Sequence, residues 1–103
     1  SKNMILSANG QNIYPEEIEA VVNNQPYVIE SVVVDRGARL AALVYMDAEK
    51  AKAEGVNLDE YKAVIMTEVN KSMPAYSKIS KVEIMTEPFV KTPKMSIKRF
   101  MYK

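Results

Sequence analysis

Residues 13–19 read IYPEEIE, and a glycine-containing stretch, NGQN, precedes them at residues 9–12. Pro15 suits the first position of a helix, because a helix leaves the N–H of that position unpaired and proline has none. Glu16 and Glu17 then place negative charge in the first turn, where the helix dipole favours it. The stretch therefore predicts that a helix begins at Pro15.

The residues around this start agree with it. Within residues 1–13, the segments 4–6 and 12–13 are typical of two short strands of a β-hairpin. Asn9 and Gly10 suit the turn between them, because both residue types tolerate positive φ. Beyond the start, the apolar residues Ile18, Val21 and Val22 share one helical face. We expect the helix to end before Pro26.

The rest of the chain predicts a small mixed sheet with helices packed on it. We expect strands over residues 27–34, 40–46 and 82–85, a short helical segment over 47–54, and a longer helix from Leu58 to Met73. Asn57 and Glu60 resemble a capping box at the start of the longer helix. The order is β-hairpin, α, β, β, α, β, with two main helices on the sheet. The predicted class is therefore α+β (mixed α/β).

Composition excludes several kinds of chemistry. The 103 residues are enough for one domain, and 48% are hydrophobic, which is ordinary for a globular protein. The net charge of +1 gives no reason to expect a nucleic-acid or membrane partner. Cysteine and histidine are absent, which excludes disulfides, thiolate nucleophiles, imidazole bases and nearly every zinc site. We expect no metal site, no transmembrane segment and a cytoplasmic setting.

The charged residues have simple structural interpretations. Glu16, Glu17 and Glu19 cannot all face one way on a helix, so they are poor candidates for a pair of cooperating carboxylates. The last part of the chain is basic, and composition alone favours a solvated end. Its cations are Lys91, Lys94, Lys98, Arg99 and Lys103. On these grounds the chain is an α/β module with a basic tail, and not a complete enzyme.

Four stretches carry a more specific signal. They are SKNMILSANGQNIYPEEIE at residues 1–19, VIESVVVDRGARLAALVYM at 28–46, NKSMPAYSKISKVEIM at 70–85 and KTPKMSIKRFMY at 91–102. In this order they resemble the motifs of the C-terminal domain of the adenylate-forming superfamily, which includes the acyl-CoA synthetases. The last one resembles the family's Lys-Thr-x-x-Gly-Lys-Ile-x-Arg. The resemblance covers essentially the whole chain, and long-chain fatty acid–CoA ligases are the closest group.

This resemblance implies a function in two half-reactions. A carboxylic acid and ATP give an acyl-adenylate and pyrophosphate, and CoA then displaces AMP to form the thioester. The chain, residues 1–103, would be a single domain cut at its hinge, acting as a mobile lid that is inactive alone. ATP with Mg²⁺ and CoA would be bound mainly by the missing N-terminal adenylation domain. The alternative is a stand-alone, non-catalytic binding or scaffold module with the same fold.

The resemblance also assigns roles to residues at both ends of the chain. Lys2 aligns with the hinge of the family. Asn9, Gly10 and Gln11 align with the loop that faces CoA, where a glycine lets backbone approach the pantetheine arm. A hairpin turn that needs positive φ predicts the same Gly10, and both explanations can hold.

The largest departure from the family pattern is at Ser96, which stands where relatives have the lysine that reaches the acyl-adenylate. Either a neighbouring lysine substitutes, or the enzyme adenylates without this group, or adenylation is lost. On an extended tail Lys94 would project to the same side as Ser96, because side chains alternate with period two. We therefore expect Lys94 to be a partial substitute.

Overall fold

The helix predicted to begin at Pro15 forms in the computed structural model, which describes residues 3–37 and 39–102. A two-stranded hairpin precedes this helix, and a three-stranded sheet with further helices follows it. In chain order the elements are β1 (Ile5–Leu6), β2 (Asn12–Ile13), α1 (Pro15–Val22), β3 (Val28–Asp35), β4 (Leu40–Met46), α2 (Ala48–Ala53), α3 (Leu58–Lys71) and β5 (Ile79–Met85). Two 3₁₀ turns lie at Ala75–Ser77 and Arg99–Met101.

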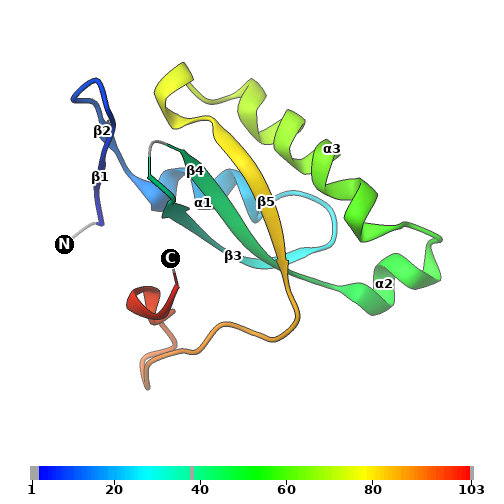
Figure 1. The fold of residues 1–103 in the computed structure, drawn as a ribbon. Coiled ribbons are helices and arrows are strands. Elements are labelled where there is room, and N and C mark those ends of the chain that lie inside the picture. Colours follow the sequence, from blue (N-terminus) through cyan, green and yellow to red (C-terminus); the bar gives the residue numbers. More distant parts are fainter. Residues whose placement is uncertain (1–2, 38, 103) are drawn as a thin grey trace.

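The main sheet has the strand order β3-β4-β5 (Figure 1). Strands β3 and β4 are antiparallel, whereas β4 and β5 are parallel. A parallel pair needs a long crossover between its strands, and here α2 and α3 form that crossover. The separate hairpin, the mixed sheet and the packed helices confirm the predicted α+β class.

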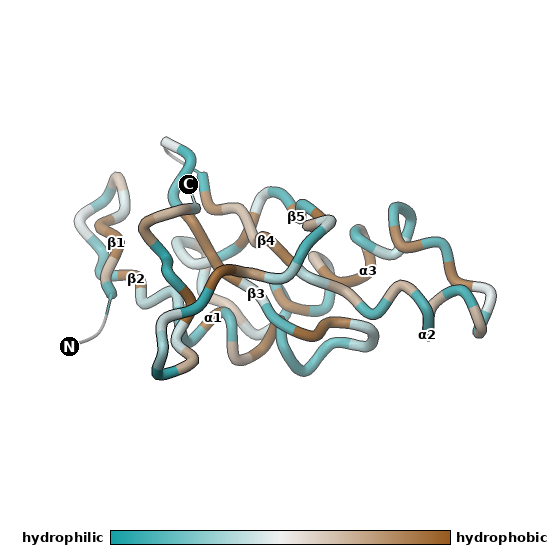
Figure 2. The backbone as a smooth tube through the Cα atoms, turned by 90° about the horizontal axis from the view of Figure 1, so that it is seen from below, coloured by the Kyte–Doolittle hydropathy of each residue, from teal (hydrophilic) through white to brown (hydrophobic). Residues whose placement is uncertain are grey.

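Side chains on a strand alternate between the two faces of a sheet, and here each face contributes to a buried cluster. On one face, Val44 of β4 belongs to a core cluster with Ile18 of α1 and Ile65 of α3. On the other face, Leu43 belongs to a second cluster that includes Phe89, which lies beyond β5. In Figure 1 the sheet lies between α3 and the orange-to-red end of the chain, and Figure 2 shows hydrophobic segments gathered around the strands.

The element boundaries differ from the predicted ones mainly at β5. The sequence predicts a strand over residues 82–85, but β5 begins at Ile79. The side-chain amide of Asn70, near the end of α3, donates to the carbonyl of Ile79 at 2.9 Å and accepts from its N–H at 2.8 Å. These two hydrogen bonds reproduce those of a neighbouring strand, so β5 is held from its first residue. Periodicity could not reveal this contact between α3 and β5.

The helix starts follow the capping chemistry that the sequence indicates. The Asn57 side chain accepts a hydrogen bond from the N–H of Glu60 at 3.1 Å, which is half of the predicted capping box. The Asp47 side chain accepts from the N–H of Lys50 at 3.0 Å at the start of α2. These contacts satisfy N–H groups that the first turn of a helix leaves without a partner.

Tyr27 adopts an unusual backbone conformation between α1 and β3, with φ of 70°. Its hydroxyl donates to the carboxylate of Glu54 at 2.6 Å, and its ring meets Tyr61 edge-on at 5.2 Å between centroids. Its carbonyl accepts from the N–H of Asp47 at 2.7 Å. Tyr27 therefore joins the start of β3 to both α2 and α3.

The hydrogen bond to Glu54 raises the pKa of Tyr27 to about 12, because ionising the phenol would break that bond beside a negative charge. The folded state thus favours the neutral phenol. Its contribution to stability is complete below the unfolded pKa of about 10 and is lost as the pH rises through about 12. We expect Glu54→Gln to lower the pKa of Tyr27 toward that of an ordinary tyrosine. NMR titration of the tyrosine Cζ carbons measures it, and Tyr27 ionising with an ordinary pKa in the unsubstituted chain would contradict the prediction.

Candidate functional site

The tail, residues 86–102, folds back on itself beside the sheet. Lys91 and Ile97 form an isolated antiparallel bridge, and the N–H of Lys98 donates to the carbonyl of Val90 at 2.8 Å. The two arms of the tail therefore run in opposite directions and are joined by the tail turn, residues 92–96. The candidate residues Lys94 and Ser96 both lie in this turn.

Hydrogen bonds close the tail turn tightly. The N–H of Thr92 donates to the carbonyl of Ser96 at 2.7 Å, and the N–H of Met95 donates to the carbonyl of Thr92 at 2.8 Å. The N–H of Ser96 donates to the Thr92 hydroxyl at 3.2 Å. Met95 has φ of 67°, in the left-handed region. The expectation of an extended tail is therefore wrong at this point.

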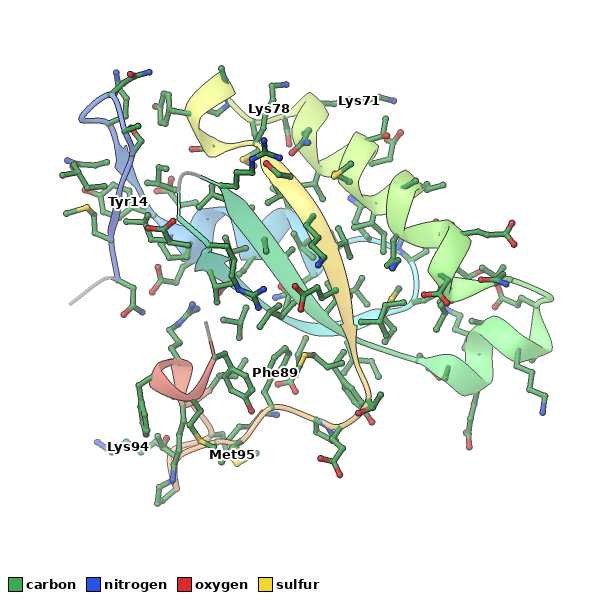
Figure 3. The ribbon with its side chains drawn as sticks, in the orientation of Figure 1. Tyr14, Lys71, Lys78, Phe89, Lys94 and Met95 are labelled. Carbon is green, nitrogen blue, oxygen red and sulfur yellow. The ribbon has the colours of Figure 1, made fainter. Side chains whose placement is uncertain are left out.

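Because of this turn, the prediction that Lys94 projects to the same side as Ser96 no longer follows. Side chains alternate with period two only on extended backbone, so Lys94 and Ser96 cannot be assigned to one side by counting residues. Both residues are exposed, and in Figure 3 Lys94 points away from the sheet, next to Met95 on the same turn. The structure thus presents Lys94 and Ser96 together at an exposed tip, and the role of each stays a prediction.

An aromatic pair anchors the tail to the sheet. Phe89 (labelled in Figure 3) is buried against the second face. Its ring meets that of Tyr102 edge-on at 5.0 Å between centroids. The hydroxyl of Tyr102 also accepts a hydrogen bond from the N–H of Val90 at 2.7 Å. The first and last parts of the tail are therefore held together over the sheet, and the tail turn projects from them.

Two ion pairs add to this anchor, and they correct the expectation of a solvated basic tail. Lys91 pairs with Glu30 of β3 at 2.6 Å, and both side chains are mostly buried. Arg99 forms a two-pronged pair with Glu19 of α1. Of the predicted tail cations, Lys94 remains exposed, whereas Lys91 and Arg99 fix the tail to α1 and β3. Lys103 lies outside the described residues.

The role of Glu19 does not follow from the sequence pattern alone, in which the acids of α1 suggest at most a carboxylate pair. The buried residues of α1 are Pro15, Ile18, Glu19 and Val22, a spacing that places them on one helical face. A carboxylate on that face indicates a buried partner. This signal was present, but it could not identify a residue 80 positions away.

The other candidate site is the hairpin loop, residues 7–11, between β1 and β2. Gly10 has φ of 81°, and a Cβ built on it would meet no atom within 4 Å. In this domain, glycine is therefore required by the backbone conformation and not by close packing. The Ser7 hydroxyl and carbonyl accept from the N–H groups of Gln11 at 2.9 Å and Gly10 at 3.0 Å. Asn9, Gly10 and Gln11 are all exposed, as a loop that contacts a ligand requires.

The hairpin loop and the tail turn lie apart from each other, at the upper left and the lower left of Figure 1. Lys2, the predicted hinge, lies outside the described residues. Within residues 3–37 and 39–102, no group of three or more acidic, histidine or cysteine side chains could hold a metal ion. None of the helices in those ranges has the length and apolar character needed to cross a membrane.

Comparison with known proteins shows which family the chain belongs to. The sequence pattern of the family described as AMP-binding enzyme C-terminal domain matches residues 2–102. The chain belongs to this family. It thus has the sequence pattern of the C-terminal domain of AMP-binding enzymes. No curated protein matches the chain.

Solved structures have the same fold. A fatty acyl-CoA synthetase from Mycobacterium tuberculosis is 28% identical with a TM-score of 0.70, over 95% of this chain and 18% of that one. An acyl-CoA synthetase from Brucella canis is 25% identical with a TM-score of 0.75, over 96% of this chain and 18% of that one. ATP-bound MatB from Rhodopseudomonas palustris, 20% identical with a TM-score of 0.75 over 97% of this chain and 19% of that one, shares the fold. The domain spans less than a fifth of each.

Met95 stands where the family motif has glycine, and its left-handed conformation explains that preference. A non-glycine residue pays about 1–2 kcal/mol for this conformation. We expect Met95→Gly to stabilise the fold by about 1 kcal/mol, because Met95 is 71% exposed and loses little packing. Met95→Ala is the matched control, since it removes the side chain but keeps the unfavourable φ. Urea denaturation of both variants measures the difference, and equal stability of the two would contradict the explanation.

Proposed function

We propose that this domain is the mobile lid of an ATP-dependent long-chain fatty acid–CoA ligase. In the first half-reaction a fatty acid carboxylate attacks the α-phosphate of ATP, forming an acyl-adenylate and releasing pyrophosphate. In the second, the thiol of CoA attacks the acyl carbonyl and AMP leaves. The domain presents a different loop to the active site in each half-reaction and rotates at a hinge near Lys2.

The observation that carries this proposal is the separation of the hairpin loop from the tail turn within one small domain (Figure 1). Two loops that lie apart in this way would not both face one active site in a single orientation. A domain that uses both must therefore rotate between half-reactions. The hairpin loop would face CoA, with Gly10 leaving room for the pantetheine arm, and the tail turn would face the acyl-adenylate.

The missing parts of the enzyme follow from this assignment. An N-terminal adenylation domain holds ATP with Mg²⁺, the fatty acid and most of CoA. The matched domain is less than a fifth of the length of its solved neighbours, which leaves room for such a domain. The fatty acyl-CoA synthetase at 28% identity supports a fatty acid as the substrate. We place the enzyme in the cytoplasm, where these cofactors are available.

The chemistry of the tail turn rests on Lys94. Charge develops on the carboxylate and α-phosphate oxygens during adenylation, and a compact ammonium group can offset it. Ser96, at the position of the family lysine, offers a hydroxyl that can donate a hydrogen bond but carries no charge. Lys94 is two residues from Ser96 in the sequence, and both residues lie at the exposed tip of the tail turn.

This assignment is tested in the full-length enzyme by measuring pyrophosphate release. We expect Lys94→Ala to slow adenylation about tenfold or more, as the loss of one charge-stabilising donor does elsewhere. Lys98→Ala is the matched control, because it removes a lysine outside the tail turn. Ser96→Lys is expected to restore or raise the rate. If Lys94→Ala is silent and Ser96→Lys gains nothing, the tail does not supply the cation.

A second candidate function is a stand-alone binding or scaffold module with this fold. The replacement of the family lysine by Ser96 favours it, because a module without chemistry has no need for the charge. The gene distinguishes the two functions. A reading frame that encodes several hundred residues before Ser1 supports the ligase, whereas a native start near Ser1 supports the module.

The ligase assignment also predicts how activity is divided between the domains. We expect residues 1–103 alone to release no pyrophosphate above a blank with ATP, CoA and fatty acids. The full-length protein should form acyl-CoA, and deleting residues 3–102 from it should abolish thioester formation. The control is the same deletion assayed for ATP binding, which the N-terminal domain should retain. Acyl-CoA formation by the isolated domain would refute the lid function.

A further inference from the structure

We propose that Glu19 is a positioning residue for adenylation: its carboxylate clamps Arg99 and thereby fixes the tail turn that carries Lys94 and Ser96. This inference rests on the proposed function, because it assumes that the tail turn reaches the acyl-adenylate. It adds a residue from the opposite end of the chain to the machinery of that half-reaction.

The clamp has the geometry of a strong, directional interaction. Both Nη atoms of Arg99 contact the carboxylate of Glu19, one oxygen each, with the Nη1–Oε2 distance at 2.7 Å. Oε2 also accepts from the N–H of Val33 in β3 at 2.7 Å. The side chain of Glu19 is only 7% exposed and that of Arg99 is 26% exposed. Three hydrogen bonds orient this carboxylate, and the two-pronged contact orients the plane of the guanidinium as well.

Arg99 stays positively charged at all ordinary pH values. The hydrogen bonds that Arg99 donates to the carboxylate of Glu19 raise the pKa of Arg99 above its already high usual value, although burial opposes them. Glu16 also lies near enough to favour the charged form. Arginine is therefore always the cation here, and its fork matches a carboxylate in a way that a lysine does not.

Chain connectivity transmits this constraint to the tail turn. Arg99 begins the 3₁₀ turn Arg99–Met101, a short distance along the chain from Ser96. On the other arm, Lys91 directly precedes the tail turn and pairs with Glu30. The tail turn is thus held by an ion pair on each side. The aromatic pair of Phe89 and Tyr102 keeps the tail on the sheet independently of both ion pairs.

The contacts that position the tail turn are therefore different from those that attach the tail to the sheet. Without the charge of Glu19, the aromatic anchor still attaches the tail, but the guanidinium is free to turn toward solvent. The variant Glu19→Gln is the sharpest one, because its amide oxygen can still accept from the N–H of Val33 and protect the edge of β3. It removes the carboxylate and keeps the shape of the side chain.

The experiment uses full-length enzyme and measures the half-reactions separately, as pyrophosphate release and as conversion of supplied acyl-adenylate to acyl-CoA. We expect Glu19→Gln to slow the first about tenfold or more and to change the second less than about twofold. Arg99→Lys should recover part of the rate that Arg99→Ala loses. The matched control is Glu83→Gln, which removes the charge of the 2.8 Å pair with Arg36, an ion pair that contains no tail residue, and should affect neither half-reaction.

Amide hydrogen exchange supplies a readout that does not depend on activity. In Glu19→Gln, the N–H groups of Thr92 and Met95, which close the tail turn, should exchange about tenfold faster, while those of β4 stay protected. Unchanged exchange in the tail turn overturns the inference. Equal slowing of both half-reactions, or unchanged adenylation, also overturns it. Failure of the proposed function is distinct, because the unsubstituted full-length enzyme would then form no acyl-CoA.

Discussion

The ion pair between Glu19 and Arg99 joins three parts of the structure that are distant in the chain. Glu19 belongs to α1, its second hydrogen bond reaches the edge of β3 at Val33, and Arg99 belongs to the tail. A buried carboxylate is unfavourable unless its charge is compensated, so the arginine stabilises the packing of this face of α1 on the sheet. The first helix and the last turn of the chain are therefore joined directly.

The tail also completes the hydrophobic core. Strand β3 contains a run of buried valines, which is typical of a strand that is covered on both faces. Helices α1 and α3 cover one face, and Phe89, Ile97 and Tyr102 of the tail cover part of the other. The tail, which contains the candidate residues Lys94 and Ser96, thus also buries apolar surface. This double role explains how a tail with little regular structure presents a defined turn.

The two candidate loops are built in different ways. The hairpin loop depends on its own hydrogen bonds and on a glycine with positive φ. The tail turn contains a left-handed methionine and depends on contacts with α1, β3 and the sheet. The tail turn is therefore more sensitive to distant substitutions. In a domain that rotates between half-reactions, such contacts would keep the tail turn in place while the whole domain moves as one body.

The sequence by itself determined the elements and the family. Pro15 and the acids after it placed the first helix, Asn57 placed the start of α3, and alternation and apolar runs placed β3 and β4, because these signals are local. Four motifs in order were enough to recognise the C-terminal domain. Asn9 and Gly10 indicated the hairpin loop for the same local reason.

Tertiary structure alone decided how the ends of the chain meet. The partner of Glu19 lies 80 positions away, and periodicity within α1 contains no information about it. The earlier start of β5 required the side chain of Asn70 from a neighbouring helix. The direction of Lys94 depended on a turn with positive φ at Met95, a residue type that rarely adopts this conformation. Local preferences predicted an extended, solvated tail, and long-range ion pairs and aromatic packing overrode them.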